Sequence, residues 1–331
     1  MAKLRLTLAC WDYDRTRALA DGSVQPEGIE LNYLNMHVEE TFFRMLRHRE
    51  FDVAEMSLSS YAMSMARLDE PPFIAIPVFP SRFFRQSCIF VSAKSGIREP
   101  RDLVGKRVGT PEYQMTAPVW IRGILQDEYG VDPASVEYYT GGEEEPGREE
   151  KLKLDLPAKF KLRRIGPTQT LAQMIADGEL DAMYTARIPS TFETRPGTVT
   201  RLFENCVEVE RAYYRKTGIF PIMHTVAIRR DVYRGNPWIA QALTKAFVEA
   251  KRKVYENLYT TSALTTMLPW QIAQVEDVRR EMGDDWWAYG LPPNRHVLDA
   301  FLRYHYEQGL SKRRLQPEEL FAPETLEAFK I

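Results

Sequence analysis

The chain has 331 residues, more than most single-core domains, and its 44% hydrophobic and 27% charged residues are ordinary for a globular protein. A net charge of −2, with no long basic stripe carrying aromatic residues, argues against a nucleic-acid surface. No run approaches the roughly 20 apolar residues of a membrane helix, and the N-terminal apolar stretch is too short for a secretory signal. We therefore expect two domains, a cytoplasmic location and no membrane partner.

Short apolar strands alternate with helical patterns through the first two-thirds of the chain, which predicts an α/β fold with mainly parallel sheets. A first repeat of this alternation ends near residue 79. Its expected strands are 4–10, 29–34, 52–56 and 74–79, and its expected helices are 13–20 (with Asp12 as N-cap), 38–47 and one opening at serines 57–60.

The alternation then starts again. Its expected strands are 89–92, 106–110, 136–139, 162–165 and 181–184, with 200–203 at the edge, and its expected helices are 116–129, ended by Gly130, and 168–176. The segment 141–160 is charged and contains Gly and Pro. Because charge runs are usually solvated, we expect this segment to be an exposed hairpin or loop outside any site.

An apolar run near 217–233 is expected to begin a new domain segment. Two amphipathic helices are expected after it, at 237–258 and 294–307. This order predicts a discontinuous first lobe, 1–86 with 219–331, and a second lobe, 87–218. Two crossovers, 80–87 and about 205–224, would join the lobes. Ligands in open α/β sheets lie beyond the carboxyl ends of the strands, so a cleft is expected between the lobes with both crossovers as its floor.

Two stretches resemble known proteins. The first, "DLVGKRVGTPEYQMTAPVWIRGIL", resembles the second-domain opening of the type II periplasmic-binding-protein fold. The second, "WWAYGLPPNRHVLDAFLRYHYEQGLSKRRLQPEELFAPET", is similar to the 4,5-dihydroxyphthalate decarboxylase family, and "RFFRQS" and "GTPEYQMTA" agree with it. The resemblance implies two doubly wound lobes joined by two crossover strands, with C-terminal helices. It also implies cofactor-independent loss of CO2 from 4,5-dihydroxyphthalate, giving 3,4-dihydroxybenzoate.

The first crossover, "PSRFFRQS", carries the expected anion clamp. Arg82 and Arg85 each offer a planar fork that matches a carboxylate, and Gln86 could add a hydrogen bond. An interdomain salt bridge is the alternative use of these arginines. In the second lobe, "GTPEYQMTA" precedes a helix whose free N–H groups favour an anion.

Four residues of the second lobe would then face the cleft. They are Tyr113, Gln114 and Thr116, with Arg187 of "YTARIP" as a further anion ligand. Thr116 as a simple helix cap and Arg187 as a surface salt bridge stay open.

Decarboxylation of an aromatic acid needs a proton donor for the ring carbon. His224, on the second crossover, is the first choice because its ordinary pKa allows it to exchange protons near neutrality. His296, in a loop rich in aromatic residues, is the second choice. His37, His48 and His305 are expected to be solvated.

The loops after the first and third strands add further candidates. Asp14 could accept a proton from a catechol, and Ser60 could bind substrate, although helix capping is the commoner use of Asp. Cys10, Cys88 and Cys206 are scattered without CxxC spacing, and no clustered His and carboxylate motif occurs. We therefore expect no metal and no cofactor.

Two other functions remain open. A solute-binding protein for an aromatic or dicarboxylic acid would use the same fold without chemistry, since function is carried by the site. An enzyme of pyrimidine or thiamine-precursor synthesis would need a site rich in cysteine or histidine, which the sequence lacks. The expected partner is a small aromatic dicarboxylate, and assembly into a homo-oligomer is left open.

Overall fold

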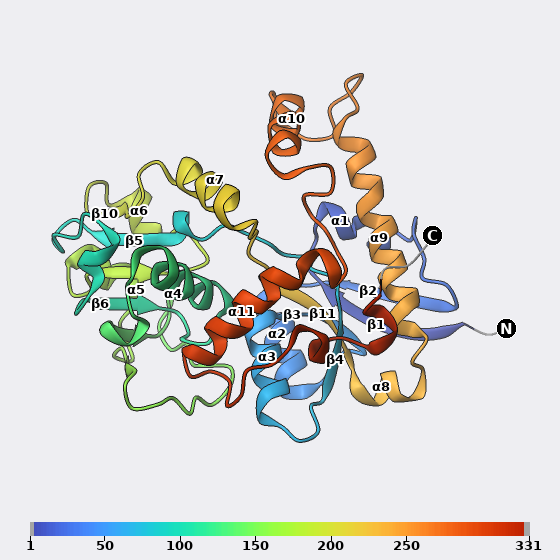
Figure 1. Ribbon diagram of the computed structural model, residues 1–331, viewed down its shortest axis with the longest axis horizontal. Helices are drawn as coiled ribbons and strands as arrows, with labels where there is room; N and C mark the ends of the chain where they lie inside the picture. The colour runs from blue at the N-terminus through green and yellow to red at the C-terminus, as the bar shows by residue number, and fades with distance from the viewer. Residues whose placement is uncertain (1–2, 328–331) are drawn as a thin grey trace.

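The computed structural model describes residues 3–327, and in this part of the chain two sheets form the centres of two α/β lobes (Figure 1). The five-stranded sheet has the order β2-β1-β3-β11-β4, and the six-stranded sheet has the order β10-β5-β9-β6-β7-β8. The expected α/β fold of two lobes is confirmed. The exact lobe boundaries, 1–86 with 219–331 and 87–218, stay a prediction.

The first sheet combines β1 (Leu4–Cys10), β2 (Ile29–Asn35), β3 (Val53–Ser57), β4 (Phe73–Ile76) and β11 (His224–Arg229). Strands β1, β2 and β3 are parallel, whereas β11 is antiparallel to both β3 and β4. All five residues of β3 are buried, as expected of a central strand, whereas β2 is partly exposed at the edge. The return of the chain through β11 separates β3 from β4, which local sequence patterns did not indicate.

The second sheet combines β5 (Ile89–Ser92), β6 (Arg107–Thr110), β7 (Glu137–Thr140), β8 (Lys161–Arg164), β9 (Ala182–Tyr184) and β10 (Val199–Arg201). The helices are α1 (Asp14–Ala20), α2 (Val38–His48), α3 (Leu58–Arg67), α4 (Thr116–Tyr129), α5 (Leu171–Asp177), α6 (Ser190–Thr194), α7 (Cys206–Thr217), α8 (Arg230–Gly235), α9 (Ile239–Leu258), α10 (Gln271–Met282) and α11 (Arg295–Glu307).

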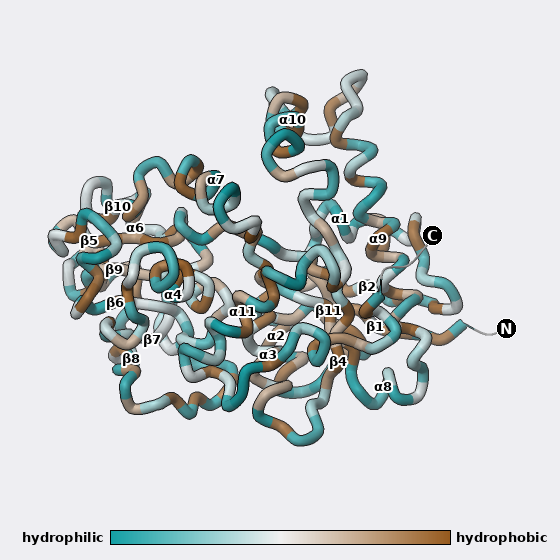
Figure 2. Tube along the Cα trace, viewed as in Figure 1, coloured by the Kyte–Doolittle hydropathy of each residue, from teal (hydrophilic) through white to brown (hydrophobic). Residues whose placement is uncertain are grey.

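Hydrophobic stretches run along β1, β11 and β4 in the interior (Figure 2). No helix in residues 3–327 combines the length and hydropathy needed to cross a membrane.

The two crossovers run side by side. Residues Arg82 and Ile222 form an antiparallel bridge, and the Met223 N–H donates to the carbonyl of Ser81 at 2.8 Å. Helix α7 occupies residues 206–217, so the second crossover is shorter than the expected 205–224. Pairing of the two segments fixes them against each other, and the side chains that they carry are therefore held in register between the lobes.

One further expectation was wrong. Helix α1 begins at Asp14 and its N-cap is Tyr13, so Asp12 does not cap it; Asp12 instead pairs with Arg17 at 3.4 Å. The region between the two expected C-terminal helices contains a further helix, α10, for which no element was predicted from the sequence. Together with the end of α9, this helix projects from the body of the molecule (Figure 1).

Candidate active site

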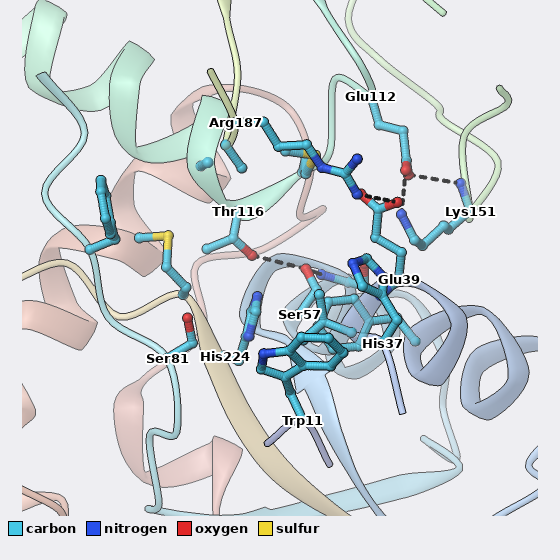
Figure 3. Close-up of a pocket in the computed structure, with 18 of the residues that line it drawn as sticks. Trp11, His37, Glu39, Ser57, Ser81, Glu112, Thr116, Lys151, Arg187 and His224 are labelled. Atoms are coloured by element: carbon cyan, nitrogen blue, oxygen red, sulfur yellow. Dashed lines mark hydrogen bonds and ion pairs between the residues drawn. The ribbon is translucent and has the colours of Figure 1, made fainter. Parts of the chain in front are cut away.

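A cavity of about 340 Å³ lies between the lobes, and its walls come from both sheets (Figure 3). Its first-lobe residues follow the carboxyl ends of β1 and β3, and its second-lobe residues follow those of β6 and β9. His224 begins β11 and pairs with Ser57 at the end of β3, so it reaches the same edge. The cleft position expected from the topology of open sheets therefore holds for this cavity.

His224, which lines the cavity, pairs with the fully buried Glu55. The His224 Nδ1 and the Glu55 Oε1 are 2.6 Å apart, and Glu55 also accepts hydrogen bonds from the Tyr13 hydroxyl at 2.7 Å and the Trp11 N–H at 3.1 Å. Burial raises the pKa of Glu55, but the hydrogen bonds outweigh burial and hold its pKa below the ordinary value. Glu55 is therefore an ionised partner that keeps the proton of His224 on Nδ1.

The other ring nitrogen of His224 is free to meet a ligand. His224 lines the cavity, its ring packs edge-on against Phe42, and no residue in 3–327 forms a hydrogen bond with its Nε2. The sequence predicts His224 as the proton donor but does not identify Glu55 as its partner. A carboxylate in the middle of the mostly apolar stretch "VAEMS" could have indicated a buried charge with a specific partner.

The two arginines of the first crossover have different surroundings. Arg85 lines the cavity, and its guanidinium contacts the sulfur atoms of Met223 at 3.1 Å and Cys88 at 3.5 Å. Within residues 3–327 no carboxylate forms an ion pair with it, although it is buried. Arg82 points away from the cavity and donates to the carbonyls of Phe220 and Ala288 and to Asn294. The expectation that both arginines face the ligand is therefore wrong for Arg82.

Thr116 and Ser60 also line the cavity, as expected. The Thr116 hydroxyl lies 2.9 Å from the Ser57 hydroxyl and accepts a hydrogen bond from the Ser59 N–H, so it joins the lobes instead of capping its own helix. The Ser60 hydroxyl contacts the amide of Gln114 at 3.2 Å. Gln114 itself is buried beneath the wall of the cavity, outside its lining.

The segment 141–160 contributes to the cavity, contrary to expectation. Its Arg148 donates to Glu112 at 2.7 Å and to Glu39 at 3.1 Å, and its Lys151 also pairs with Glu112. Arg187, expected at the site, lines the cavity and pairs with Glu39 at 3.1 Å. Glu149 and Asp155 have exposed partners on the surface. Arg148 and Lys151 instead pair with a buried carboxylate, and Arg148 also pairs across the lobes. Partners so distant in the sequence are not visible in a local pattern of charges.

The remaining expected residues lie outside the cavity lining, for identifiable reasons. Tyr113 is buried under the guanidinium of Arg122 and donates to the carbonyl of Gln308, and Gln86 is buried against the backbone of Arg85. Asp14 pairs with Arg15 at 2.9 Å on the surface. His296 contacts the carbonyl of Gly218 through Nε2 at 2.9 Å.

The three histidines expected in solvent differ from one another. His37 is exposed but lines the mouth of the cavity. His305 is fully buried: its Nδ1 meets the Ser311 hydroxyl and its Nε2 meets Ser59, so the expectation of a solvated side chain was wrong for it. Within residues 3–327 no group of three or more His, Cys, Asp or Glu side chains is arranged to hold a metal ion.

Comparison with known proteins gives close relatives at the sequence level. A 4,5-dihydroxyphthalate decarboxylase from Comamonas testosteroni is 44% identical over 331 residues, covering 100% of both chains. A 4,5-dihydroxyphthalate decarboxylase from Pseudomonas putida is 42% identical over 215 residues, which are 65% of this chain and 83% of that protein. No protein-family model matches the chain.

Solved structures resemble the fold at low sequence identity. The ligand-binding component of an ABC-type import system from Staphylococcus aureus has a TM-score of 0.53 at 11% identity, covering 98% of both chains. The periplasmic aliphatic sulphonate binding protein from Escherichia coli has a TM-score of 0.51 at 11% identity, covering 98% of this chain and 99% of that one. These similarities confirm a fold like that of periplasmic binding proteins.

Proposed function

The chain belongs to the 4,5-dihydroxyphthalate decarboxylase family, and from this we propose that its interlobe cavity converts 4,5-dihydroxyphthalate to 3,4-dihydroxybenzoate and CO2. It is an enzyme of the carboxy-lyase class. The observation that carries the proposal for this cavity is the His224–Glu55 pair, which presents a free Nε2 to a cavity that also holds a buried arginine without a carboxylate partner.

Arg85 binds a substrate carboxylate in this proposal. A buried guanidinium that meets only sulfur atoms and an aromatic ring keeps hydrogen-bond donors for a ligand. Burial lowers the pKa of Arg85, which reflects the cost of a desolvated charge that an anionic ligand would offset. Arg82 carries no such role, because it lies outside the cavity lining and protein oxygens already accept from both of its terminal nitrogens.

His224 is the acid. Its protonated imidazole donates from Nε2 to the ring carbon that bears the departing carboxylate, and the C–C bond then breaks, so that CO2 leaves and its electron pair returns to the ring. One proton is consumed, and His224 regains it from water. Glu55 holds Nδ1–H and stabilises the imidazolium before the transfer, as carboxylates paired with catalytic histidines do.

Measurement of turnover distinguishes the proposed enzyme from a solute-binding protein. Purified protein is incubated with 4,5-dihydroxyphthalate, and CO2 and 3,4-dihydroxybenzoate are followed by chromatography. Stoichiometric release of both products is expected. Tight binding without turnover would overturn the proposal and favour the binding-protein alternative.

His224→Asn tests the acid. We expect a folded protein with near-normal substrate affinity and a kcat lowered about 100-fold or more, within the range of general acid–base groups. His296→Asn is the matched control, because His296 contacts only a backbone carbonyl outside the cavity and should keep normal turnover. Normal turnover of His224→Asn together with loss of turnover in His296→Asn would show that the general acid is His296, in the C-terminal loop.

The cytoplasmic location and the state of assembly stay predictions. Cell fractionation and light scattering of the purified protein test them.

A further inference from the structure

A cluster of five charged side chains lies at one side of the cavity, away from Ser81 and His224 (Figure 3). It contains the carboxylates Glu39 and Glu112 and the cations Arg148, Lys151 and Arg187. Glu112 is buried and accepts hydrogen bonds from Arg148 Nη2 at 2.7 Å and from Lys151. Glu39 pairs with Arg148 and Arg187, each at 3.1 Å. The cluster is therefore held together from both lobes.

Within the cluster three cations face two carboxylates, which leaves one excess positive charge. Two further carboxyls, Glu143 and Glu150, also interact with these cations; burial raises the pKa of both, that of Glu150 to about 7, so the excess is largest while they hold their protons. The side chains of Lys151 and Arg148 are only 10% and 22% exposed, so water screens this excess weakly. All five side chains line the cavity. A single negative charge on a ligand would balance the cluster.

The groups proposed to hold the remaining carboxylate and to protonate the ring carbon, Arg85 and His224, lie elsewhere in the cavity. Arg85 contacts Met223, which directly precedes His224, so the clamp on the first crossover and the acid on the second lie close together where the two crossovers pair. In 4,5-dihydroxyphthalate the hydroxyl groups stand on the side of the ring opposite the carboxylates. A substrate whose carboxylate meets Arg85 and whose ring carbon meets His224 therefore extends its hydroxyls toward the cluster.

This inference rests on the proposed function: we propose that Lys151 binds the hydroxyl para to the departing carboxylate as a phenolate. Lys151 Nζ has N–H groups beyond the one that Glu112 accepts, whereas all three nitrogens of Arg148 donate to Glu112 and Glu39, so Arg148 adds its positive charge without contacting the phenolate. The hydroxyl proton passes to water when the substrate binds. The phenolate electron pair moves into the ring as the ring carbon takes the proton of His224, giving a cyclohexadienone. Cleavage of the C–C bond releases CO2 and returns the electron pair to the oxygen, so the phenolate is restored.

Such a site acts by electrostatic preorganisation. The cations are fixed by Glu112 and Glu39 before the substrate arrives, so no reorientation is needed at the moment of reaction. Glu112 serves as a positioning residue, because its buried carboxylate holds both Arg148 and Lys151. Asp14, expected as a proton acceptor for the catechol, lies outside the cavity and has no part in this step.

The test uses 3,4-dihydroxybenzoate, which keeps the catechol and has no second carboxylate to lose. The ultraviolet spectrum of its complex with the protein is titrated with pH. The spectrum of the ligand-free protein at each pH is subtracted, which removes the absorbance of ionising tyrosines, and the remaining catecholate absorbance reports ionisation of the ligand. Glu150, whose pKa burial and Glu112 raise to about 7, titrates nearby but does not absorb there. We expect the bound catechol to ionise about one pH unit or more below the free compound.

Lys151→Met should move this ionisation back toward that of the free compound, whereas Lys151→Arg, which keeps the charge, should retain most of the shift. Lys153→Met is the matched control, since Lys153 is an exposed cation of the same segment outside the cavity. Phthalate has both carboxylates but no hydroxyl. Its affinity should stay within about threefold in Lys151→Met, which also reports that the cavity is folded.

Two outcomes would overturn the inference. One is a bound catechol that ionises at the same pH as the free compound. The other is an affinity for phthalate that falls about tenfold or more in Lys151→Met while catechol ionisation is unchanged, which would make the cluster a carboxylate site. Either result is compatible with turnover of 4,5-dihydroxyphthalate by the unaltered protein, and only absence of that turnover contradicts the proposed function.

Discussion

Two arginines three residues apart show how the surroundings of a side chain decide its use. Arg82 and Arg85 are both buried, and burial lowers the pKa of Arg82 to about 10. Arg82 donates to two backbone carbonyls and an asparagine, which ties the first crossover to the C-terminal loop near Asn294. Arg85 meets sulfur atoms instead. The first arginine is structural and the second is available to an anion.

Replacement of each arginine by Met should separate these roles. We expect Arg85→Met to fold normally and to lose about two orders of magnitude in kcat/KM, equivalent to about 3 kcal/mol of a charge-assisted contact. Arg82→Met should instead lower the free energy of unfolding by about 3 kcal/mol, because it leaves buried oxygens without donors. Steady-state kinetics and urea unfolding measure both effects. Normal turnover of folded Arg85→Met would contradict the clamp.

His305 gives a stability prediction that depends on pH. Burial lowers its pKa from the ordinary 6.5 to about 3 in the folded protein. Between these values the unfolded chain binds a proton that the folded chain does not, so the free energy of unfolding falls as pH decreases below 6.5. At pH 5 the cost is about 2 kcal/mol relative to pH 8.

Urea unfolding from pH 5 to 8 checks this expectation. His305→Gln should lose that part of the pH dependence, whereas His296→Gln, which replaces an exposed histidine, should keep it. Identical slopes for the original protein and His305→Gln would show that His305 is protonated when folded.

At the scale of elements, the packing of α11 on α4 supports the cavity from behind. Helix α4 carries Thr116 at its first turn, and Gly123 on the same helix lies under the ring of Tyr304 of α11. A Cβ at Gly123 would come within 2.2 Å of that ring. The Tyr304 hydroxyl also donates to Asp127 at 2.6 Å, so the ring has little freedom to move aside. The close approach of the two helices therefore requires glycine.

Gly123→Ala should lower the free energy of unfolding by about 1–3 kcal/mol, the usual cost of an overpacked core. Gly235→Ala is the control, because a Cβ there meets no atom within 4 Å and its φ is not positive. Urea unfolding of both variants measures the difference. A Gly123→Ala protein as stable as the control would mean that α11 shifts without cost.

At the scale of the whole molecule, the cavity unites the two lobes. Ser57 and Thr116 join them by one hydrogen bond, and Glu39 joins them by ion pairs to Arg148 and Arg187. A ligand in this cavity contacts both lobes at once and should stabilise them together. At phthalate concentrations of about 100 times its Kd, we expect about 2.7 kcal/mol of added stability in one unfolding transition.

Calorimetry with and without phthalate measures this stabilisation, and Arg85→Met should reduce it while leaving the transition of the free protein in place. Two separate unfolding transitions, with phthalate raising the midpoint temperature of only one, would contradict a ligand that is bound by both lobes.

Removal of metal should leave activity unchanged, since we expect no metal to take part. Activity is measured before and after dialysis against EDTA. Loss of turnover that one divalent metal restores would contradict this expectation.

The sequence by itself determined the α/β class, most strands and helices to within a few residues, and the family, because hydrophobic periodicity and family motifs are local or linear features. It also identified His224, Arg85, Thr116, Ser60 and Arg187, which do line the cavity. Only the tertiary structure decided that Glu55 partners His224, that Arg82 is structural, and that Arg148 and Lys151 of the charged segment reach the cavity. The reason is physical: the use of a charged side chain depends on which partners surround it. Those partners lie 169 residues away for His224 and up to 212 residues away for Arg82.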